Sequence, residues 1–275
     1  MINDHWILEI PAWNRWNVHF SVAAGLALLG GLYVYLGGLK AGRRHVASFA
    51  ASLLVLFLAL NGPLHNLSDT YLFSAHMAQH LLLTLVFPPL LLYGTPSAVM
   101  RQLLRPRWVM TVARVVTRPL VAAAVFTAPI VLWHVPAFYE AALRDHNLHI
   151  VQHLVFLTTA VIMWWPVLSP VPELPRLPHL LQMLYLFLLG IPMSITGALI
   201  ALSDRVLYPF YAAAAPRVGG LSPLDDQQIG GLLMWVLGGL MLWIVMTVIW
   251  FRWSSWDARG DADRVVPLDV YGPGA

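Results

Sequence analysis

Apolar residues in this chain of 275 residues fall into long runs that are bounded by charged residues, proline or glycine. A bilayer core about 30 Å thick needs about 20 helical residues to cross it. Seven runs approach that length, and each predicts a transmembrane helix. We therefore expect an all-α, polytopic membrane bundle of about seven helices. The predicted spans are Val18–Gly38, Val46–Leu64, Tyr71–Tyr93, Pro119–Val135, Leu148–Leu168, Leu177–Leu202 and Pro223–Phe251.

The composition leads to the same class of protein. Apolar residues make up 59% of the chain and charged residues 11%, whereas a soluble globular chain has about 45–50% and about 25%. There is no cysteine, which excludes a disulfide scaffold, thiolate metal sites and thiol redox chemistry. Any bound metal must therefore be held by histidine, methionine or carboxylate side chains.

The basic residues predict an orientation for the seven spans. Positive charge concentrates on the cytoplasmic side of membrane proteins. We therefore expect the N-terminus outside, the C-terminus inside and the plasma membrane as the location. The net charge of +3 reflects this orientation, so we do not predict a nucleic-acid partner. Twelve basic residues share one side, namely Lys40, Arg43, Arg44, Arg101, Arg105, Arg107, Arg114, Arg118, Arg176, Arg252, Arg259 and Arg264, and four share the other, namely Arg15, Arg144, Arg205 and Arg217.

The domain organisation follows from the same pattern. Residues 1–253 are expected to form one transmembrane domain, and residues 254–275, which are rich in aspartate, proline and glycine, a flexible cytoplasmic tail. The connection Thr95–Arg118 is long enough for an amphipathic segment on the inner membrane surface.

Histidines are frequent and unevenly placed. The chain has eleven, and His5, His45 and His179 are the three that lie apart from the rest. In the predicted topology the remaining eight map to the outer ends of five helices or to the loops that join them. These eight are His19, His65, His76, His80, His134, His146, His149 and His153.

Two pairs of these histidines have helical spacing. His76 and His80 are four residues apart, as are His149 and His153, so each pair lies on one helix face with Cβ atoms about 6 Å apart. Ionisable side chains inside membrane spans are costly unless they are paired or ligated. We therefore predict a shared metal or haem site of four imidazoles, with His134 at the same depth as a fifth candidate.

Several neighbouring residues are further candidates, either as extra ligands or as groups that orient the imidazoles. His65 and His146 lie at the same level, and Met77 offers a thioether between His76 and His80. Asp226 and Gln227 follow a helix start at Ser222, in which a serine cap, a proline and Asp225 have a purely structural explanation. Asp226 and Gln227 are not needed for that start, so they could hold an imidazole in place.

The residue types leave three functions open. Imidazole binds copper, zinc, iron and nickel. The pairs fit a non-catalytic copper-binding protein, a b-type cytochrome with bis-histidine haem ligation, or a membrane di-iron oxygenase. The oxygenase would need carboxylates, and the acids near the pairs are Glu140, Asp145, Asp225 and Asp226.

Four motifs together resemble the CtaG-like cytochrome c oxidase assembly factors, over roughly residues 61–252. The motifs are His76-Met77-Ala78-Gln79-His80 followed by Pro88-Pro89, Trp133-His134-Val135-Pro136, His149-Ile150-Val151-Gln152-His153 followed by Trp164-Trp165-Pro166, and Ser222-Pro223-Leu224-Asp225-Asp226-Gln227-Gln228.

The resemblance implies a multi-pass membrane protein that helps to assemble a haem-copper oxidase. It implies copper as the metal, with His76, His80, His134, His149 and His153 as the shared polar positions. The implied partners are cytochrome c oxidase subunits and other copper chaperones, and the metal site faces the outer side of the plasma membrane. A site that transfers metal is expected to be open and incompletely coordinated.

Overall fold

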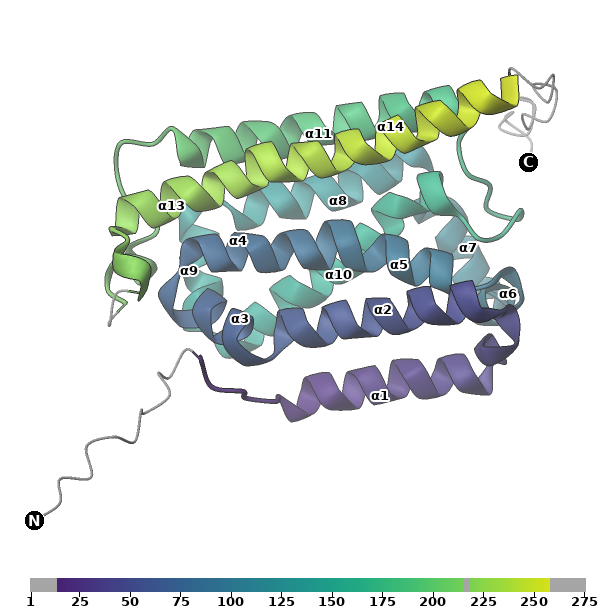
Figure 1. Ribbon diagram of the computed structural model, residues 1–275, viewed down its shortest axis with the longest axis horizontal. Helices are drawn as coiled ribbons and strands as arrows, with labels where there is room; N and C mark the ends of the chain where they lie inside the picture. Colours follow the sequence, from purple (N-terminus) through teal and green to yellow (C-terminus); the bar gives the residue numbers. More distant parts are fainter. Residues whose placement is uncertain (1–13, 215–217, 258–275) are drawn as a thin grey trace, which may run out of the picture.

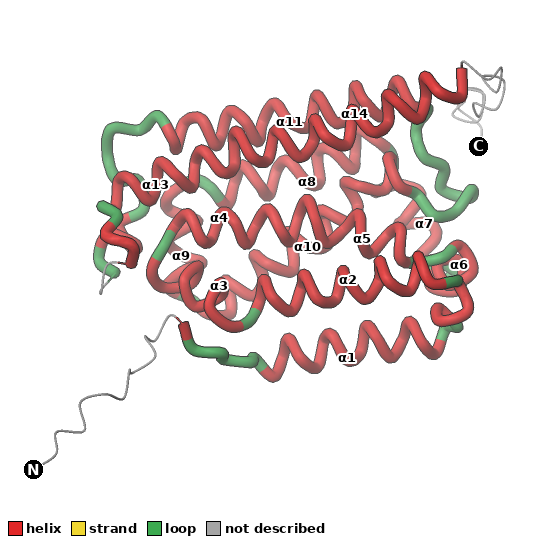
Figure 2. The backbone as a smooth tube through the Cα atoms, in the orientation of Figure 1, coloured by secondary structure: helices red, strands yellow, loops and turns green. Residues whose placement is uncertain are grey.

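The computed structural model describes residues 14–214 and 218–257, and every regular element within those ranges is a helix. The predicted all-α fold is therefore confirmed. The long helices share one general direction (Figure 1), and the loops gather at the two ends of the bundle (Figure 2).

Five helical segments in the described ranges are long and apolar enough to cross a membrane. They match the second, third, fifth, sixth and seventh predicted spans, to within a few residues at most ends. They are α2 (Arg43–Leu60), the segment Phe73–Gly94, α10 (His146–Leu168), α11 (His179–Ala201) and the segment Pro223–Ser255.

The first and fourth predicted spans form shorter helices. Helix α1 (Phe20–Tyr35) has 16 residues and α8 (Pro119–Trp133) has 15. Helix α8 follows α7 (Arg107–Val116) through a bend of 80°, and the two can be counted together as one broken span. By length and composition the described residues thus contain five or six spans, and the count of seven and the orientation stay predictions.

The connection before α8 contains α6 (Ser97–Leu103) and α7. Helix α7 has no buried residue, whereas α6 buries Val99 and Met100. This is the segment in which the sequence predicted a surface helix.

The second predicted span ends earlier than expected. Helix α2 stops at Leu60, because Asn61 has an extended backbone and its side-chain amide donates to the Phe57 carbonyl at 2.9 Å. Gly62 has a φ of 66°, a left-handed conformation that glycine adopts readily, and Pro63 disfavours right-handed helical geometry in that residue. The chain then turns across the end of the bundle through α3 (Gly62–Asn66) and the π-helical segment η3 (Leu67–Tyr71).

The third predicted span continues as a helix through Pro88 and Pro89. It consists of α4 (Phe73–Leu81), the π-helical segment η4 (Leu82–Val86) and α5 (Phe87–Gly94). Pro88 has no N–H with which to bond the Thr84 carbonyl four residues earlier. Instead, the indole Nε1 of Trp164 donates to that carbonyl at 2.9 Å, which joins this span to α10.

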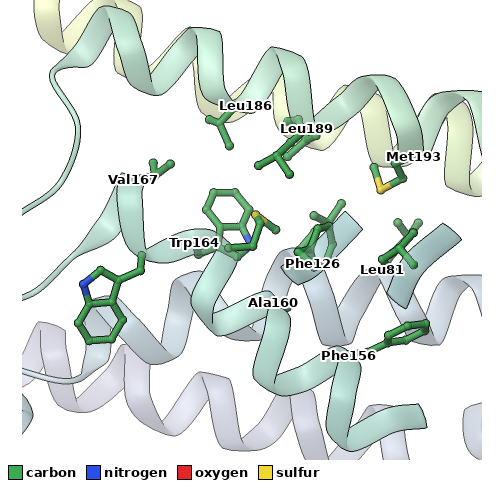
Figure 3. Packing of buried hydrophobic residues seen from close by; sticks show 14 of the residues in the cluster. Leu81, Phe126, Phe156, Ala160, Trp164, Val167, Leu186, Leu189 and Met193 are labelled. Atoms are coloured by element: carbon green, nitrogen blue, oxygen red, sulfur yellow. The ribbon is translucent and has the colours of Figure 1, made fainter. Parts of the chain in front are cut away.

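The core lies around α10, which packs against α8 on one side and α5 on another. Trp164 is 1% exposed and lies near Leu186 and Leu189 of α11 (Figure 3). Helix α13 (Pro223–Leu232) packs against α4 and α11. This approach is close enough that a Cβ added at Gly230 would lie 2.3 Å from the Phe73 ring.

The remaining elements are short or continue a span. Segment η2 (Gly38–Ala41) joins α1 to α2, and α9 (Pro136–Arg144), α12 (Pro209–Ala212) and η5 (Val218–Gly220) lie in the connections between longer helices. The last span runs from α13 through η6 (Leu233–Leu237) into α14 (Gly238–Asp257). The helix therefore extends past residue 254, where the sequence predicted a tail, and the rest of that tail lies outside the described residues.

Candidate metal centre

The two predicted histidine pairs come together in the interior of the bundle. His76 and His80 project from α4, and His149 and His153 from α10; none of the four is more than 7% exposed. The two Nε2 atoms of the first pair are 2.8 Å apart and those of the second 3.1 Å apart. The ring centroids of His76 and His149 are 5.4 Å apart, so the pairs face each other across the two helices.

Three of these residues fit a common metal ion. His76, His149 and His153 each offer one ligand atom, and these three atoms lie within 4.8 Å of one another. A metal holds imidazole nitrogens at about 2.0–2.1 Å, which places two ligands of one ion no more than about 4.2 Å apart. Small side-chain rotations would close that difference.

The hydrogen bonds of His76 Nδ1 leave the lone pair of the ring on Nε2, the atom that lies 2.8 Å from His80 Nε2. The Tyr211 hydroxyl lies 2.6 Å from the Ser68 carbonyl, a distance that requires the hydroxyl hydrogen to point there. The same hydroxyl is 2.8 Å from His76 Nδ1, so Nδ1 must carry the hydrogen of that bond. The lone pair of His76 therefore lies on Nε2, toward the other three histidines.

His134 is held in a similar way. Its Nδ1 donates to the Ile130 carbonyl at 2.6 Å, and its Nε2 is buried with no hydrogen-bond partner among the described residues. Its ring centroid is 6.0 Å from that of His80, whose Nδ1 is also buried and unpartnered in the part of the chain that the structure describes. Buried nitrogens without partners are costly, and a bound ion is one way to satisfy them.

Aromatic rings enclose the first pair and separate it from the loops. Tyr139 and Tyr211 are 1% and 2% exposed, and the centroid of the Tyr139 ring lies 5.3 Å from that of His76. Phe156 lies edge-on to His80 at 4.8 Å. The cluster is therefore more enclosed than the open transfer site that the sequence suggested.

Asp226 and Gln227 bond to backbone groups and not to an imidazole. The Asp226 carboxylate accepts hydrogen bonds from the backbone N–H groups of Phe73 and Ser74 at 2.7 and 3.1 Å, which caps the start of α4. Gln227 accepts from the Leu207 N–H at 2.6 Å. Neither side chain therefore orients an imidazole directly. The packing of α13 on α4 directs Asp226 at the start of α4 and Gln227 at the loop that contains Leu207.

The serine cap predicted at Ser222 is confirmed, since its hydroxyl accepts from the Asp225 N–H at 3.1 Å. Met77 is 1% exposed and lies near Gly230 of α13. A Cβ atom added at Gly230 would lie 3.2 Å from the Cγ atom of Met77. This contact places Met77 on the face of α4 that packs against α13.

His65 lies beside the second pair, joined to it by a residue that sequence reasoning missed. Its Nε2 is 3.3 Å from Asp69 Oδ2, and Asp69 Oδ1 is 3.7 Å from His149 Nε2. Asp69 lies outside the apolar spans, but its spacing of four residues from His65 was a signal that could have identified it.

Burial shifts the pKa values of His65 and Asp69 in opposite directions. It lowers the pKa of His65 to about 4, with a smaller contribution from the nearby His19 and His149, so His65 is neutral at pH 7 and able to act as a ligand. Burial raises the pKa of the Asp69 carboxyl to about 7, although the hydrogen bond from the Ser68 hydroxyl opposes that shift.

His19 and His146 line a cavity next to the cluster. This cavity, of about 240 Å³, lies between α1, α2 and α10 and is bordered by His19, His65, Asp69, His146, His149 and His153. His146 is exposed, at the first turn of α10. His45 lies near the start of α2 and His179 at the start of α11, and these two helix starts are at the opposite end of the bundle from the start of α4 (Figure 1). His5 lies outside the described residues.

Residues 31–255 match the family described as cytochrome c oxidase caa3 assembly factor (Caa3_CtaG). The chain belongs to this family. The match includes both histidine pairs, His134 and the capping segment at Ser222, and it confirms the resemblance drawn from the motifs.

Curated relatives of this family member come from mycobacteria. The chain is 26% identical over 262 residues to uncharacterized proteins Mb0105 of Mycobacterium bovis and MT0111 of Mycobacterium tuberculosis, an alignment that covers 86% of the chain and 39% of each relative. Uncharacterized protein ML1998 of Mycobacterium leprae is 27% identical over 206 residues, or 68% of the chain and 31% of the relative. The chain thus spans about a third to two fifths of the length of these relatives. No solved structure matches it.

Proposed function

We propose that this assembly factor binds copper through His76, His80, His149, His153 and His134 and delivers it to subunits of a cytochrome c oxidase. Copper is the cargo of this reaction, and the protein has no catalytic role in it. Loading would take place from the outer side of the plasma membrane, with other copper chaperones as potential donors.

The observation that carries the proposal is the convergence of imidazole nitrogens from two helices. His76, His149 and His153 bring three nitrogens within 4.8 Å of one another in a buried setting. Without an ion, the short Nε2 contacts within each pair require one ring to donate to the other. An ion could use the same lone pairs, and His80 Nδ1 and His134 Nε2 are two further buried nitrogens without a partner among the described residues.

Copper is favoured over the other metals by the family to which the chain belongs, since a haem-copper oxidase needs copper for its assembly. Imidazole is a suitable ligand for this metal. A cluster without thiolate or firmly placed carboxylate also suits an ion that must be released again.

The geometry argues against the two alternatives. A haem between the pairs would need a gap for the macrocycle, yet the rings of His76 and His149 are stacked at 5.4 Å. A di-iron site would need several carboxylate ligands, but Glu140, Asp145 and Asp226 are engaged with backbone N–H groups. Asp69 is the acid that faces a paired histidine, and one carboxylate is too few for such a site.

The test is the metal content, the visible spectrum and the Cu(I) affinity of the purified full-length protein. We expect a protein without a Soret band that binds Cu(I) stoichiometrically, and loss of this binding in the double variant His76→Ala/His153→Ala. The matched control is His45→Ala/His179→Ala, which removes two histidines at the other end of the bundle. A Soret band, or unchanged copper affinity in the His76/His153 variant, would overturn the assignment. Thermal unfolding of both variants shows whether they are folded.

A further inference from the structure

The buried cluster raises the question of how an ion reaches it. The four paired histidines are at most 7% exposed, and two of them, His76 and His80, do not border the cavity between α1, α2 and α10. His149 and His153 do border it. The second pair is therefore the side of the cluster that an ion would meet first.

The other polar residues along this cavity are more exposed than the paired histidines that border it. His146 is exposed, and His19 and His65 are partly buried. The side chains of His65 and Asp69 are 14% and 27% exposed, whereas that of His149 is 9% exposed. An ion that moves along this path exchanges water for protein ligands in steps, which avoids the large cost of stripping a charge of all its ligands at once.

Asp69 connects the outer part of the path to the cluster. Its two carboxylate oxygens face different imidazoles, with Oδ2 3.3 Å from His65 Nε2 and Oδ1 3.7 Å from His149 Nε2. The His19 ring lies edge-on to His65, with centroids 4.6 Å apart. A transition-metal ion bound between an imidazole and a carboxylate has ligand distances of about 2.0–2.2 Å, and these spacings are compatible with that arrangement.

The hydrogen-bond pattern shows what such an ion would replace. Gln79 Nε2 lies 3.3 Å from His65 Nδ1 and, as the donor of that bond, leaves the ring hydrogen on Nε2, directed at Asp69. An ion held between His65 and Asp69 takes the place of this hydrogen, which is released to water as a proton. No electron transfer is involved.

We propose that His19, His65, Asp69 and His146 form a loading site for the copper ion, from which the carboxylate of Asp69 passes it to His149. This inference rests on the proposed function, because it assumes that the buried cluster is the destination. It adds a second, more exposed metal site and assigns roles to His19 and Asp69.

The experiment separates the rate of loading from the final occupancy. The full-length protein in detergent is mixed with Cu(I) bound to a coloured chelator, and the loss of the chelator complex is followed by stopped flow. We expect the double variant His65→Gln/Asp69→Asn to load about tenfold more slowly or worse, since a carboxylate at a cleft raises the arrival rate of cations. Its final stoichiometry and copper affinity should equal those of the wild type, and Asp69→Glu should restore part of the rate.

The matched control is His45→Gln/Asp204→Asn, which also removes one imidazole and one carboxylate but leaves the cavity intact. Its loading rate should equal that of the wild type. A wild-type rate in His65→Gln/Asp69→Asn would overturn the loading site and leave the proposed function standing. Loss of final stoichiometry in that variant would also overturn it, because the two residues would then belong to the buried centre. A wild-type protein that binds no copper would overturn both proposals.

Discussion

The two histidine pairs share the sequence pattern His-x-x-Gln-His but have different surroundings. His76, on α4, is bonded to Tyr211 and enclosed by aromatic rings, and it does not border the cavity. His149, on α10, borders that cavity and faces the carboxylate of Asp69. Identical local spacing therefore yields one fixed pair and one accessible pair.

The comparison extends to the way in which each helix begins. The first N–H groups of α4 are bonded by Asp226, which is fully buried and comes from another span. Those of α10 are bonded by Asp145, the exposed residue that directly precedes the helix. The first pair thus depends on a contact between spans, whereas the second depends on its own chain segment.

The largest expected effect concerns these two caps. Asp226→Asn should lower the free energy of unfolding by about 2–3 kcal/mol, because charged hydrogen bonds in a buried site are lost. Asp145→Asn should leave stability unchanged, because asparagine caps a helix as well as aspartate does. Thermal unfolding in detergent measures both. Equal midpoints for the two variants would show that the starts of α4 and α10 are not held differently.

A second prediction concerns the bond between Tyr211 and His76. Tyr211→Phe should weaken copper binding by about 10–100-fold, because a metal-binding histidine loses the partner that orients its ring. Tyr185→Phe is the control, since that hydroxyl donates to the Met163 carbonyl and not to an imidazole. Competition titration with a Cu(I) chelator gives both affinities. If the two variants bind copper equally well, Tyr211 does not orient His76.

The smallest expected effect distinguishes the two glutamines. Gln79 donates to the Ala59 carbonyl at 2.7 Å, whereas both amide atoms of Gln152 are buried without a partner among the described residues. Gln79→Leu should cost about 1 kcal/mol of stability and Gln152→Leu close to nothing, because only the first change removes a hydrogen bond. Chemical or thermal unfolding of the metal-free protein tests this. A larger loss in Gln152→Leu would reveal a partner for its amide.

The sequence predicted the fold class and the two pairs for the same physical reason. Both depend on local rules, namely the length of an apolar run and the spacing of one helical turn, so no knowledge of the packing is needed. It also predicted the cap at Ser222, whose partner Asp225 is three residues away.

Other features depend on contacts between distant residues, and the sequence left them open or placed them differently. Asp226 bonds to Phe73, 153 positions earlier in the chain, and a Trp164 indole meets the carbonyl that Pro88 leaves free. The early end of α2 comes from the backbone of Asn61 together with a proline two residues later. The spacing of Asp69 from His65 is local, but only the packing shows that its carboxylate also faces His149.

By itself, then, the sequence determined an all-helical membrane protein of the oxidase assembly family, with imidazole in place of thiolate as its available metal ligand. The tertiary structure decided which imidazoles meet, which one is fixed by Tyr211, and which pair borders a cavity. The physical reason is the distance along the chain over which each interaction acts. Helical spacing and hydrophobicity act within about 20 residues of chain, whereas a shared site requires α4, α10 and the connection that contains Asp69 to be packed together.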